Sequence, residues 1–584
     1  MTEHFEVLER DGAARRGEVR LTESLQTPAL VGDRLEDAGS EWVADRDRPA
    51  GDESVVTVLP HRAMPSGTPD RVQDAFAADH PDVEYPSAAV VSPRTAADVG
   101  ADVYVLSGAP GIVGHGERFV SAIVETRRAI PDDAALYLPG VATPATVATL
   151  VYAGVDLLDA TRATVAGTRG QYLTTEGSHD CEDLEELPCS CAACSVGVEE
   201  FDREACARHN RNALAAELAR VRRRIHDGRL RDYVEGQARH TAWLTATLRE
   251  LDDQWRYLEE RTPVFRDSLL LSATDDALRR PEIRRFANRV VDRYERRLEN
   301  VPLLLVPCSA KKPYSESQSH HQFQRAARYR GHVVSMTSPI GVVPQELELT
   351  YPAQHYDAVV TGRWSASEVE MVADVLEAYL DRSDYSRIVA HVPSDGYRSV
   401  VERAVADRDV PVTYTVEDHP TTDASLENLA DALAGERTIR VEERERATLA
   451  AVTDHHLGAG AADAILADAD VRGRYPKLQA IAPDGDQLAA LVPTYGTVAL
   501  TLAGARRWLD AQVPTKTVEI DDFVPHGSVL APGVVDADER IRVGDEVVVE
   551  GPSALAVGRA ATHGRAMSEG SRGVAIDVRH VTER

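Results

Sequence analysis

A cysteine followed closely by two adjacent lysines forms the segment of the chain best suited to covalent chemistry. Residues 307–321 read PCSAKKPYSESQSHH, directly after the apolar run VPLLLV at 301–306. In α/β proteins, reacting groups collect at the carboxyl ends of strands, which is where this segment stands. A nearby cation lowers the pKa of a thiol and favours the thiolate, its nucleophilic form. The segment therefore predicts that Cys308 is a nucleophile with polar partners beside it.

Lysine is rare in this chain, which makes the pair conspicuous. Only four of the 65 basic side chains are lysines, and Lys311 and Lys312 are two of them. An ammonium is compact and its pKa shifts readily, whereas a guanidinium stays charged. We therefore expect Lys311, Lys312, Ser315 and His320 to supply hydrogen bonds, charge or proton transfer at Cys308. A polar anion-binding loop with a buried structural cysteine is the alternative interpretation.

Three other cysteines and a histidine have the spacing of metal ligands. Cys189, Cys191 and Cys194 form a C-x-C-x2-C cluster, and His209 follows at the start of a predicted helix. Three thiolates and one imidazole make the closed tetrahedral set of structural zinc sites, and such soft ligands favour zinc over magnesium or calcium. Cys206 competes with His209 as the fourth ligand. A chance cluster of buried thiols is the alternative.

The charge balance limits the partners that the chain can have. Its 584 residues carry 95 acidic side chains and a formal net charge of −30, which excludes a protein held on nucleic acid by net charge but allows local basic patches. An acidic, lysine-poor composition suits molar salt, because charges are screened within about 3 Å at 1 M salt. It predicts a halophilic, archaeal source, and an acidic mesophile with a GC-rich genome is the alternative. Six cysteines are too few for a disulfide framework. The sequence has neither a signal-peptide pattern nor a long apolar run, so we expect a cytoplasmic protein without membrane contact.

Strand and helix patterns that alternate along the chain predict an α/β protein. The predicted buried parallel strands lie at 88–93, 102–108, 135–140, 155–160, 301–310, 332–339, 357–362 and 386–393. The arginine-rich stretch 203–261 predicts helices with a solvated face, and a phosphate-facing surface is the alternative. Short strands between glycines at 541–581 predict a small β-barrel.

The cysteine cluster and the segments before it resemble the tRNA-guanine transglycosylases. The similar segments are RGEVRLTESLQTPALV at 16–31, ALYLPGVATP at 135–144 and AGVDLLDATRATVAGTRG at 153–170. The resemblance implies a (β/α)8-type barrel with a zinc site, and base exchange on tRNA by two carboxylates. Asp159 matches the nucleophile, but Leu106 stands where the family has its other acid. Because leucine transfers no proton, the barrel is expected to hold tRNA or the modified base rather than exchange it.

The cysteine–lysine segment resembles the signature of the archaeosine synthases. Residues 338–364 and 391–400 also match that family, and GVVDADERIRVGDEVVVEG at 533–551 resembles the RNA-binding PUA domain. The resemblance implies a substrate tRNA whose D-loop carries 7-cyano-7-deazaguanine. An amine adds to the nitrile, leading to the formamidine of archaeosine. The implied donor is lysine, glutamine or ammonia, with lysine favoured, and a lysine adduct would require cleavage by a radical-SAM partner enzyme. An active transglycosylase and a non-catalytic tRNA-binding scaffold are the alternatives.

These observations predict four domains and one structural zinc. The transglycosylase-like domain with the zinc site covers 1–260, and the α/β catalytic domain with the cysteine–lysine segment covers 261–430. A small α+β linker domain follows at 431–512, and the PUA domain covers 513–584. We expect tRNA and the amine donor as ligands, and a homodimer is compatible with this organisation.

Overall fold

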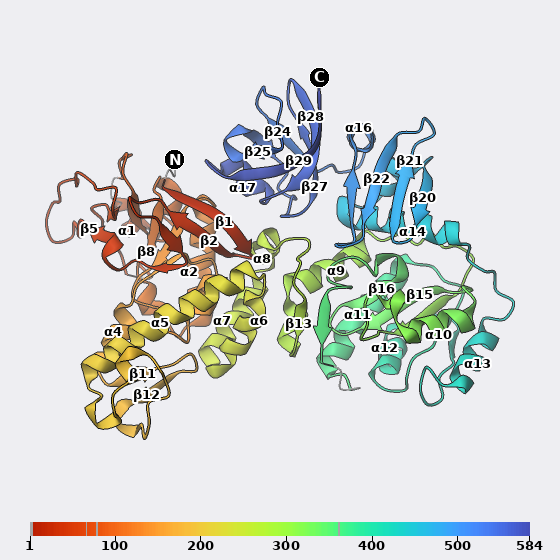
Figure 1. Ribbon diagram of the computed structural model, residues 1–584, viewed down its shortest axis with the longest axis horizontal. Coiled ribbons are helices and arrows are strands. Elements are labelled where there is room, and N and C mark those ends of the chain that lie inside the picture. The colour runs from red at the N-terminus through yellow and green to blue at the C-terminus, as the bar shows by residue number, and fades with distance from the viewer. Residues whose placement is uncertain (1–3, 66, 77–79, 360–362) are drawn as a thin grey trace. The chain divides into compact units, whose positions relative to one another are not determined.

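The computed structural model of the chain describes residues 4–65, 67–76, 80–359 and 363–584 (Figure 1). It divides into two compact units. The first contains the residues up to Thr262 together with Leu530–Val534 and Thr562–Ala575, and the second contains the remainder from Pro263 onward. Each unit has a hydrophobic core of its own.

A curled parallel sheet organises the first unit. Its strands, in pairing order, are β4 (Ala29–Leu30), β10 (Leu157–Leu158), β9 (Ala135–Leu138), β8 (Val103–Leu106), β7 (Ser87–Val91), β6 (Val56–Val58) and β5 (Leu35–Asp37). All neighbours run parallel. Strands β8 and β9 are buried at every position, as parallel strands covered on both faces are. The transglycosylase-like fold is confirmed, and in the described residues its sheet is a seven-stranded half-barrel.

Short helices alternate with these strands, as the sequence predicts. They are α1 (Asp70–Ala75), α2 (Gly116–Ala129), α3 (Val147–Tyr152) and α4 (Thr161–Thr168). An antiparallel sheet of β1 (Phe5–Asp11), β2 (Ala14–Val19) and β3 (Leu25–Thr27) precedes the parallel sheet along the chain. The hairpin of β11 (Gln171–Leu173) and β12 (Ser178–Asp180) leads into the cysteine cluster.

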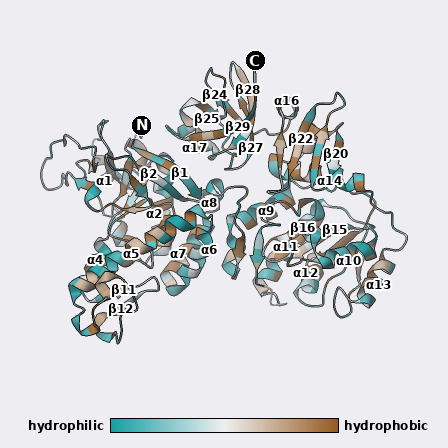
Figure 2. Cartoon of the chain, in the orientation of Figure 1, coloured by the Kyte–Doolittle hydropathy of each residue, from teal (hydrophilic) through white to brown (hydrophobic). Residues whose placement is uncertain are grey.

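The predicted arginine-rich helical region is confirmed as four helices. They are α5 (Arg203–His226), α6 (Leu230–Gln237), α7 (Ala242–Asp253) and α8 (Trp255–Arg261). Helix α5 begins where the Asp202 carboxylate accepts the Ala205 N–H, which satisfies one of the free donors of a helix start. Figure 2 shows hydrophilic residues along much of α5, and Arg223 pairs with Asp227 one turn later. This geometry agrees with a solvated helix face carrying i,i+4 pairs.

A five-stranded sheet forms the centre of the second unit. Its strands, in pairing order, are β16 (Gly341–Pro344), β15 (His332–Thr337), β14 (Leu303–Pro307), β18 (Ile388–Ala390) and β19 (Val412–Tyr414). Only β16 pairs antiparallel with its neighbour. The central strand β14 is buried from Leu303 to Val306, so its end at Pro307 brings the cysteine–lysine segment to the carboxyl edge of the sheet.

Helices and a small second sheet complete this α/β part. The helices are α9 (Pro281–Asp292), α10 (Gln318–Ala327), α11 (Ala366–Arg382), α12 (Gly396–Ala404) and α13 (Asp423–Ala432). Strand β13 (Leu270–Ser272) pairs in parallel with β17 (Tyr356–Ala358). The strand predicted at 357–362 thus appears as β17, and its last three residues lie outside the described residues.

A small mixed region and a β-rich region follow. The first contains α14 (Val441–Leu457), α15 (Ala461–Leu466), α16 (Leu502–Asp510) and the antiparallel strands β20 (Asp470–Arg474), β21 (Lys477–Ile481), β22 (Gln487–Val492) and β23 (Thr497–Leu500). The second contains α17 (Gly564–Glu569) and a six-stranded sheet of β25 (Ser528–Leu530), β29 (Val574–Glu583), β28 (Ala554–Ala560), β27 (Glu546–Glu550), β24 (Thr517–Ile520) and β26 (Val534–Ala537). The strands predicted near the end of the chain are confirmed as β27, β28 and β29.

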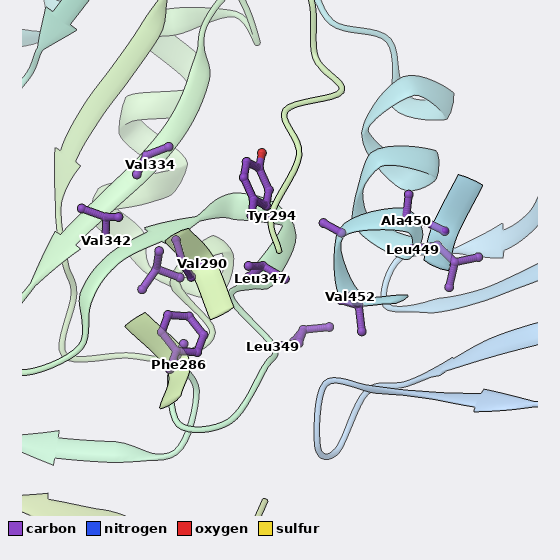
Figure 3. Close-up of a cluster of buried hydrophobic side chains, with 14 of the residues drawn as sticks. Phe286, Val290, Tyr294, Val334, Val342, Leu347, Leu349, Leu449, Ala450 and Val452 are labelled. Atoms are coloured by element: carbon purple, nitrogen blue, oxygen red, sulfur yellow. The ribbon is translucent and has the colours of Figure 1, made fainter. Parts of the chain in front are cut away.

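One hydrophobic core joins the α/β part to the mixed region within the second unit. Leu449 and Val452 of α14 belong to one buried cluster with Leu347 and Leu349, and Figure 3 shows Val452 beside Leu349. Phe286 of α9 belongs to the same buried cluster. Burying apolar surface is the main favourable term in folding, so α14 is fixed firmly against the α/β part. No helix in the described residues is long and apolar enough to cross a bilayer.

Candidate active site and metal centre

The cysteine that follows β14 lies among aromatic hydroxyl groups. Cys308 is half-buried, and its N–H donates to the Met336 carbonyl at 3.1 Å, which extends the pairing of β14 with β15. Its Sγ atom lies 3.3 Å from the hydroxyl oxygen of Tyr397, near the start of α12. Burial is the largest cause that raises the pKa of Tyr397, and the nearby Cys308 raises it further. The phenol therefore stays protonated and can donate a hydrogen bond to a thiolate.

The two adjacent lysines have different surroundings. The Nζ atom of Lys312 lies 3.8 Å from the ring centroid of Tyr356, and burial lowers the pKa of Lys312 while Cys308 and Asp357 oppose that shift. Lys311 instead is exposed and pairs with Glu316 at 3.3 Å. The structure therefore brings Lys312 to the cysteine and leaves Lys311 in solvent.

A chain of three hydroxyl groups holds this site together. The Tyr356 hydroxyl lies 2.8 Å from that of Tyr314 and 2.7 Å from Oγ1 of Thr337. Both tyrosines are buried, and burial raises the pKa of each. Since neutral hydroxyls both donate and accept, the chain links the cysteine–lysine segment to β15 and β17 and fixes the ring on which Lys312 rests.

In the part of the chain that the structure describes, no hydrogen bond joins Ser315 or His320 to Sγ of Cys308. The Ser315 N–H donates to the Glu348 carboxylate at 2.8 Å. Nε2 of His320 lies 3.1 Å from the Pro307 carbonyl oxygen, and its ring stacks on Tyr314. Burial lowers the pKa of His320 to about 4, so the imidazole is neutral near pH 7. His320 thus contacts the turn before Cys308, and its part in the chemistry stays a prediction.

One carboxylate of the half-barrel, that of Asp159, stands at the position that the resemblance matches to the nucleophile of base exchange. Asp159 follows β10, and its carboxylate accepts from the Tyr137 hydroxyl at 3.0 Å, the Gly140 N–H at 2.6 Å and the Thr161 N–H at 2.7 Å. Leu106 is buried at the end of β8. The edge of the half-barrel thus holds an ordered carboxylate at Asp159. At Leu106, where base exchange would need an acid for proton transfer, the side chain is apolar.

The predicted metal ligands come together in the first unit. The ligand atoms of Cys189, Cys191, Cys194 and His209 all lie within 4.8 Å of one another. Sγ of Cys191 lies 3.7 Å from Sγ of Cys194, and Nδ1 of His209 lies 3.7 and 3.3 Å from these two sulfurs. A tetrahedral zinc with bonds of about 2.3 Å to sulfur separates its sulfurs by about 3.8 Å. The four side chains therefore fit a bound metal of this size.

The other ring nitrogen of the histidine is held in place. Nε2 of His209 lies 3.0 Å from the Leu173 carbonyl oxygen, which leaves Nδ1 free to present a lone pair to the cluster. Cys206 lies apart from this group, with its Sγ 3.3 Å from Sγ of Cys181 and 3.3 Å from the Gln171 carbonyl oxygen. Between the two candidates for the fourth ligand, the structure brings His209 into the cluster.

Comparisons with known proteins agree with this division of sites. Residues 84–242 match the family described as queuine tRNA-ribosyltransferase, and residues 283–433 match a domain of unknown function, DUF5591. Residues 447–514 match the patch-forming domain C2 of tRNA-guanine transglycosylase, and residues 517–582 match the PUA domain. Cys308 and Lys312 thus lie in the match to the domain of unknown function, and Asp159 and the metal ligands lie in the transglycosylase match.

Two relatives align with the whole chain. The archaeosine synthase of Haloferax volcanii is 58% identical over 100% of both chains, and the archaeosine synthase subunit alpha of Methanosarcina acetivorans is 41% identical over 100% of both chains. The chain belongs to the archaeosine synthase family. A tRNA-guanine(15) transglycosylase of Methanothermobacter thermautotrophicus is 26% identical over 79% of this chain and 68% of the relative.

Sequence reasoning toward an archaeosine synthase missed the aromatic groups around the thiol. Tyr356 and Tyr397 stand inside the stretches 338–364 and 391–400 that carry the resemblance to the family, but nothing in their spacing connects them with Cys308. Tyrosine in a short strand or a first helical turn also suits packing. Their positions in those two stretches are the only signal that the sequence offers.

Proposed function

We propose that this archaeosine synthase family member modifies tRNA by adding an amine to the nitrile of 7-cyano-7-deazaguanine in the D-loop. The observation that carries the proposal is the thiol of Cys308 at a strand end, with the Tyr397 hydroxyl 3.3 Å away and the half-buried ammonium of Lys312 nearby. A nitrile is a weak electrophile toward a neutral amine, whereas a thiolate adds to it readily. Covalent catalysis splits one difficult addition into two easier ones.

In the first step, the Cys308 thiolate adds to the nitrile carbon. A C–S bond forms, one π pair of the nitrile moves to its nitrogen, and that nitrogen takes a proton to give a thioimidate. The Lys312 ammonium is the proposed proton donor, because burial lowers its pKa and eases release of the proton. The Tyr397 hydroxyl hydrogen-bonds to the sulfur and stabilises the thiolate before attack.

In the second step, the donor amine adds to the thioimidate carbon. The donor amine passes its proton to Lys312, which the first step left neutral, the C–S bond breaks, and Cys308 leaves as the thiolate, so the product is an amidine bearing the donor. Lysine is favoured over glutamine or ammonia as donor. With lysine, a radical-SAM partner enzyme would cleave the adduct to the formamidine, and this chain would be one subunit of the synthase.

The remaining parts serve binding and stability in this proposal. A structural zinc is held by Cys189, Cys191, Cys194 and His209. The soft ligands favour zinc, and a set of four protein ligands leaves no open position for catalysis. The family and the PUA match imply tRNA as the macromolecular substrate. The proposed domains divide at residues 260, 430 and 512. A cytoplasmic location and a homodimer are further expectations.

Two alternatives make different demands on the same chain. An active transglycosylase would use Asp159, whose three hydrogen bonds order the carboxylate, but Leu106 at the end of β8 offers no proton transfer. A tRNA-binding scaffold would need neither Cys308 nor Lys312. Chemistry at Cys308 is preferred because a packing role explains neither the hydroxyl at its sulfur nor the lysine beside it.

The deciding experiment supplies nitrile-bearing tRNA and one amine donor at a time to the purified protein. Nucleoside mass analysis is expected to show a mass gain that equals the added lysine. A mass gain only with ammonia or only with glutamine would identify that compound, and not lysine, as the donor. Incorporation of labelled guanine would identify a transglycosylase, and an unchanged nucleoside with every donor would favour the scaffold.

A further inference from the structure

A cavity of about 300 Å³ lies within the second unit, beside the cysteine–lysine segment. Tyr314 and Ser315 of that segment line it together with Glu348, and residues of α14 and of the turn between β20 and β21 complete its wall. The α/β part and the mixed region therefore both contribute residues to the cavity wall. Their shared hydrophobic core holds the two sides of the cavity together. Cys308 is not among the lining residues, but it lies six residues before Tyr314 on the same segment.

One side of this cavity carries a buried carboxylate without a cation. Glu348 is 6% exposed, and its two oxygens accept from the Ser315 N–H at 2.8 Å and the Tyr475 hydroxyl at 2.6 Å. No Lys, Arg or His of the described residues forms an ion pair with it. Burial raises the pKa of Glu348, because a desolvated carboxylate is costly until a positive charge approaches. Each oxygen retains a lone pair for a further donor.

The same cavity carries a guanidinium without an anion. Arg444 of α14 stacks on the Tyr329 ring at 4.0 Å, and no Asp or Glu of the described residues forms an ion pair with it. Its Nε atom is buried without a hydrogen-bond partner, as is the Oε1 atom of Gln324, which also lines the cavity. Buried polar atoms are normally satisfied, so both side chains have hydrogen-bonding capacity that the chain itself does not use.

We propose that this cavity binds the amine donor as a free amino acid, with its carboxylate on Arg444 and its α-ammonium on Glu348. Glu348 and Arg444 are charges of opposite sign without an ion pair in one small cavity, which Glu445 and Arg474 also line. Such a pair matches a zwitterion, and a guanidinium is well suited to a carboxylate. That the bound amino acid is the amine donor rests on the proposed function. Once the α-ammonium is held, reaction requires a second amine, which lysine has and glutamine lacks.

The connection to the reacting cysteine runs through Tyr314. Its ring belongs to the cavity wall, and its hydroxyl hydrogen-bonds to Tyr356, whose ring supports Lys312. Donor binding and the group around Cys308 therefore share one rigid segment. The cavity is the second substrate site of the same reaction.

Binding can be measured without tRNA and without turnover, by calorimetric titration of the full chain in molar KCl with lysine, norleucine, glutamine or inorganic phosphate. Lysine is expected to bind. Arg444→Gln should weaken its binding at least tenfold, since a charge-assisted hydrogen bond contributes about 1.4 kcal/mol or more. Glu348→Gln, which keeps the shape of the side chain, should have a comparable effect. Arg472→Gln is the control, because Arg472 is exposed and pairs with Asp470.

A lysine analogue without the α-amine separates the proposed roles of Glu348 and Arg444. 6-Aminohexanoate has the carboxylate and terminal amine of lysine but no α-amine, so Glu348→Gln should leave its affinity unchanged while Arg444→Gln lowers it. Thermal unfolding of each variant verifies that the fold is retained. Unchanged lysine affinity in folded Arg444→Gln and Glu348→Gln, or a wild type that binds phosphate but no amino acid, would overturn the inference. Failure of the covalent chemistry at Cys308 would leave these isotherms unaltered, so the two proposals fail separately.

Discussion

The thiol of Cys308 and the hydroxyl of Tyr397 lie 3.3 Å apart, although 89 positions separate them in the chain. Cys308 follows the central strand β14, and Tyr397 belongs to the first turn of α12. The carboxyl edge of the parallel sheet brings both elements to one place. The pair gives the thiolate a neutral hydrogen-bond donor that burial keeps protonated.

Replacing Tyr397 with phenylalanine removes that donor and keeps the ring. A hydrogen bond to a charged group contributes about 1.5–3 kcal/mol, so we expect product formation at saturating tRNA and lysine to slow by about 10- to 100-fold. Tyr414→Phe is the matched control, because the Tyr414 ring stacks under Arg398 and not at Cys308. Equal rates for wild type and Tyr397→Phe would show that this hydroxyl does not act on the sulfur.

The adjacent lysines offer an internal comparison. Lys312→Arg keeps the positive charge but replaces the compact, titratable ammonium on Tyr356, so it should lose most of the activity, by about tenfold or more. Lys311→Arg changes an exposed side chain paired with Glu316 and should retain nearly all of it. Rate measurements on both variants test the assignment, which a fully active Lys312→Arg protein would contradict.

The metal cluster makes a prediction about composition. Purified protein should contain about one zinc per chain, and Cys191→Ala should lose it and destabilise the first unit, because structural zinc contributes directly to folding. Cys206→Ala should keep its zinc, since the Cys206 thiol lies against Cys181. Elemental analysis with thermal unfolding measures both effects. Zinc lost in Cys206→Ala but kept in His209→Ala would reverse the assignment of the fourth ligand.

His320 should make stability depend on pH. Its pKa is lowered from 6.5 to about 4 by burial, so the unfolded chain binds a proton between these values that the folded chain does not. Stability therefore rises with pH across this window and is lost as pH falls, by up to about 3 kcal/mol. His320→Gln should flatten this part of the unfolding profile. His419→Gln, at an exposed position, is the control for the substitution itself. Identical profiles for wild type and His320→Gln would exclude the effect.

Local patterns in the sequence predicted much of the fold and the metal cluster. The cysteines of the cluster and His209 are close together in the sequence, so their spacing alone predicts the metal site. Buried apolar strands, such as the one that ends at Pro307, also have short and clear sequence patterns. Tyr397 could not be placed beside Cys308 in this way, because their proximity depends on how strands order themselves in the sheet. The same holds for Glu348 and Arg444, which come from separate regions and line one cavity.

Rarity of lysine proved to be an incomplete guide. It drew attention to Lys312, whose role at Cys308 stays a prediction, but Lys516 is equally rare and is buried in an ion pair with Asp545 at 2.6 Å. Lys516 also donates to the His456 carbonyl at 2.8 Å. An uncommon residue type therefore marks a special environment, and only the tertiary contacts separate a reactive site from a structural one.

The most direct test of the covalent chemistry is the search for the thioimidate itself. Wild-type protein is incubated with nitrile-bearing tRNA in the absence of any amine donor, and the mixture is analysed by intact mass. We expect a protein–tRNA adduct at Cys308 that disappears when lysine is added and never forms in Cys308→Ser, whose hydroxyl is not ionised at neutral pH. A Cys308→Ala protein that still forms product at a substantial rate, with no adduct in wild type, would contradict it.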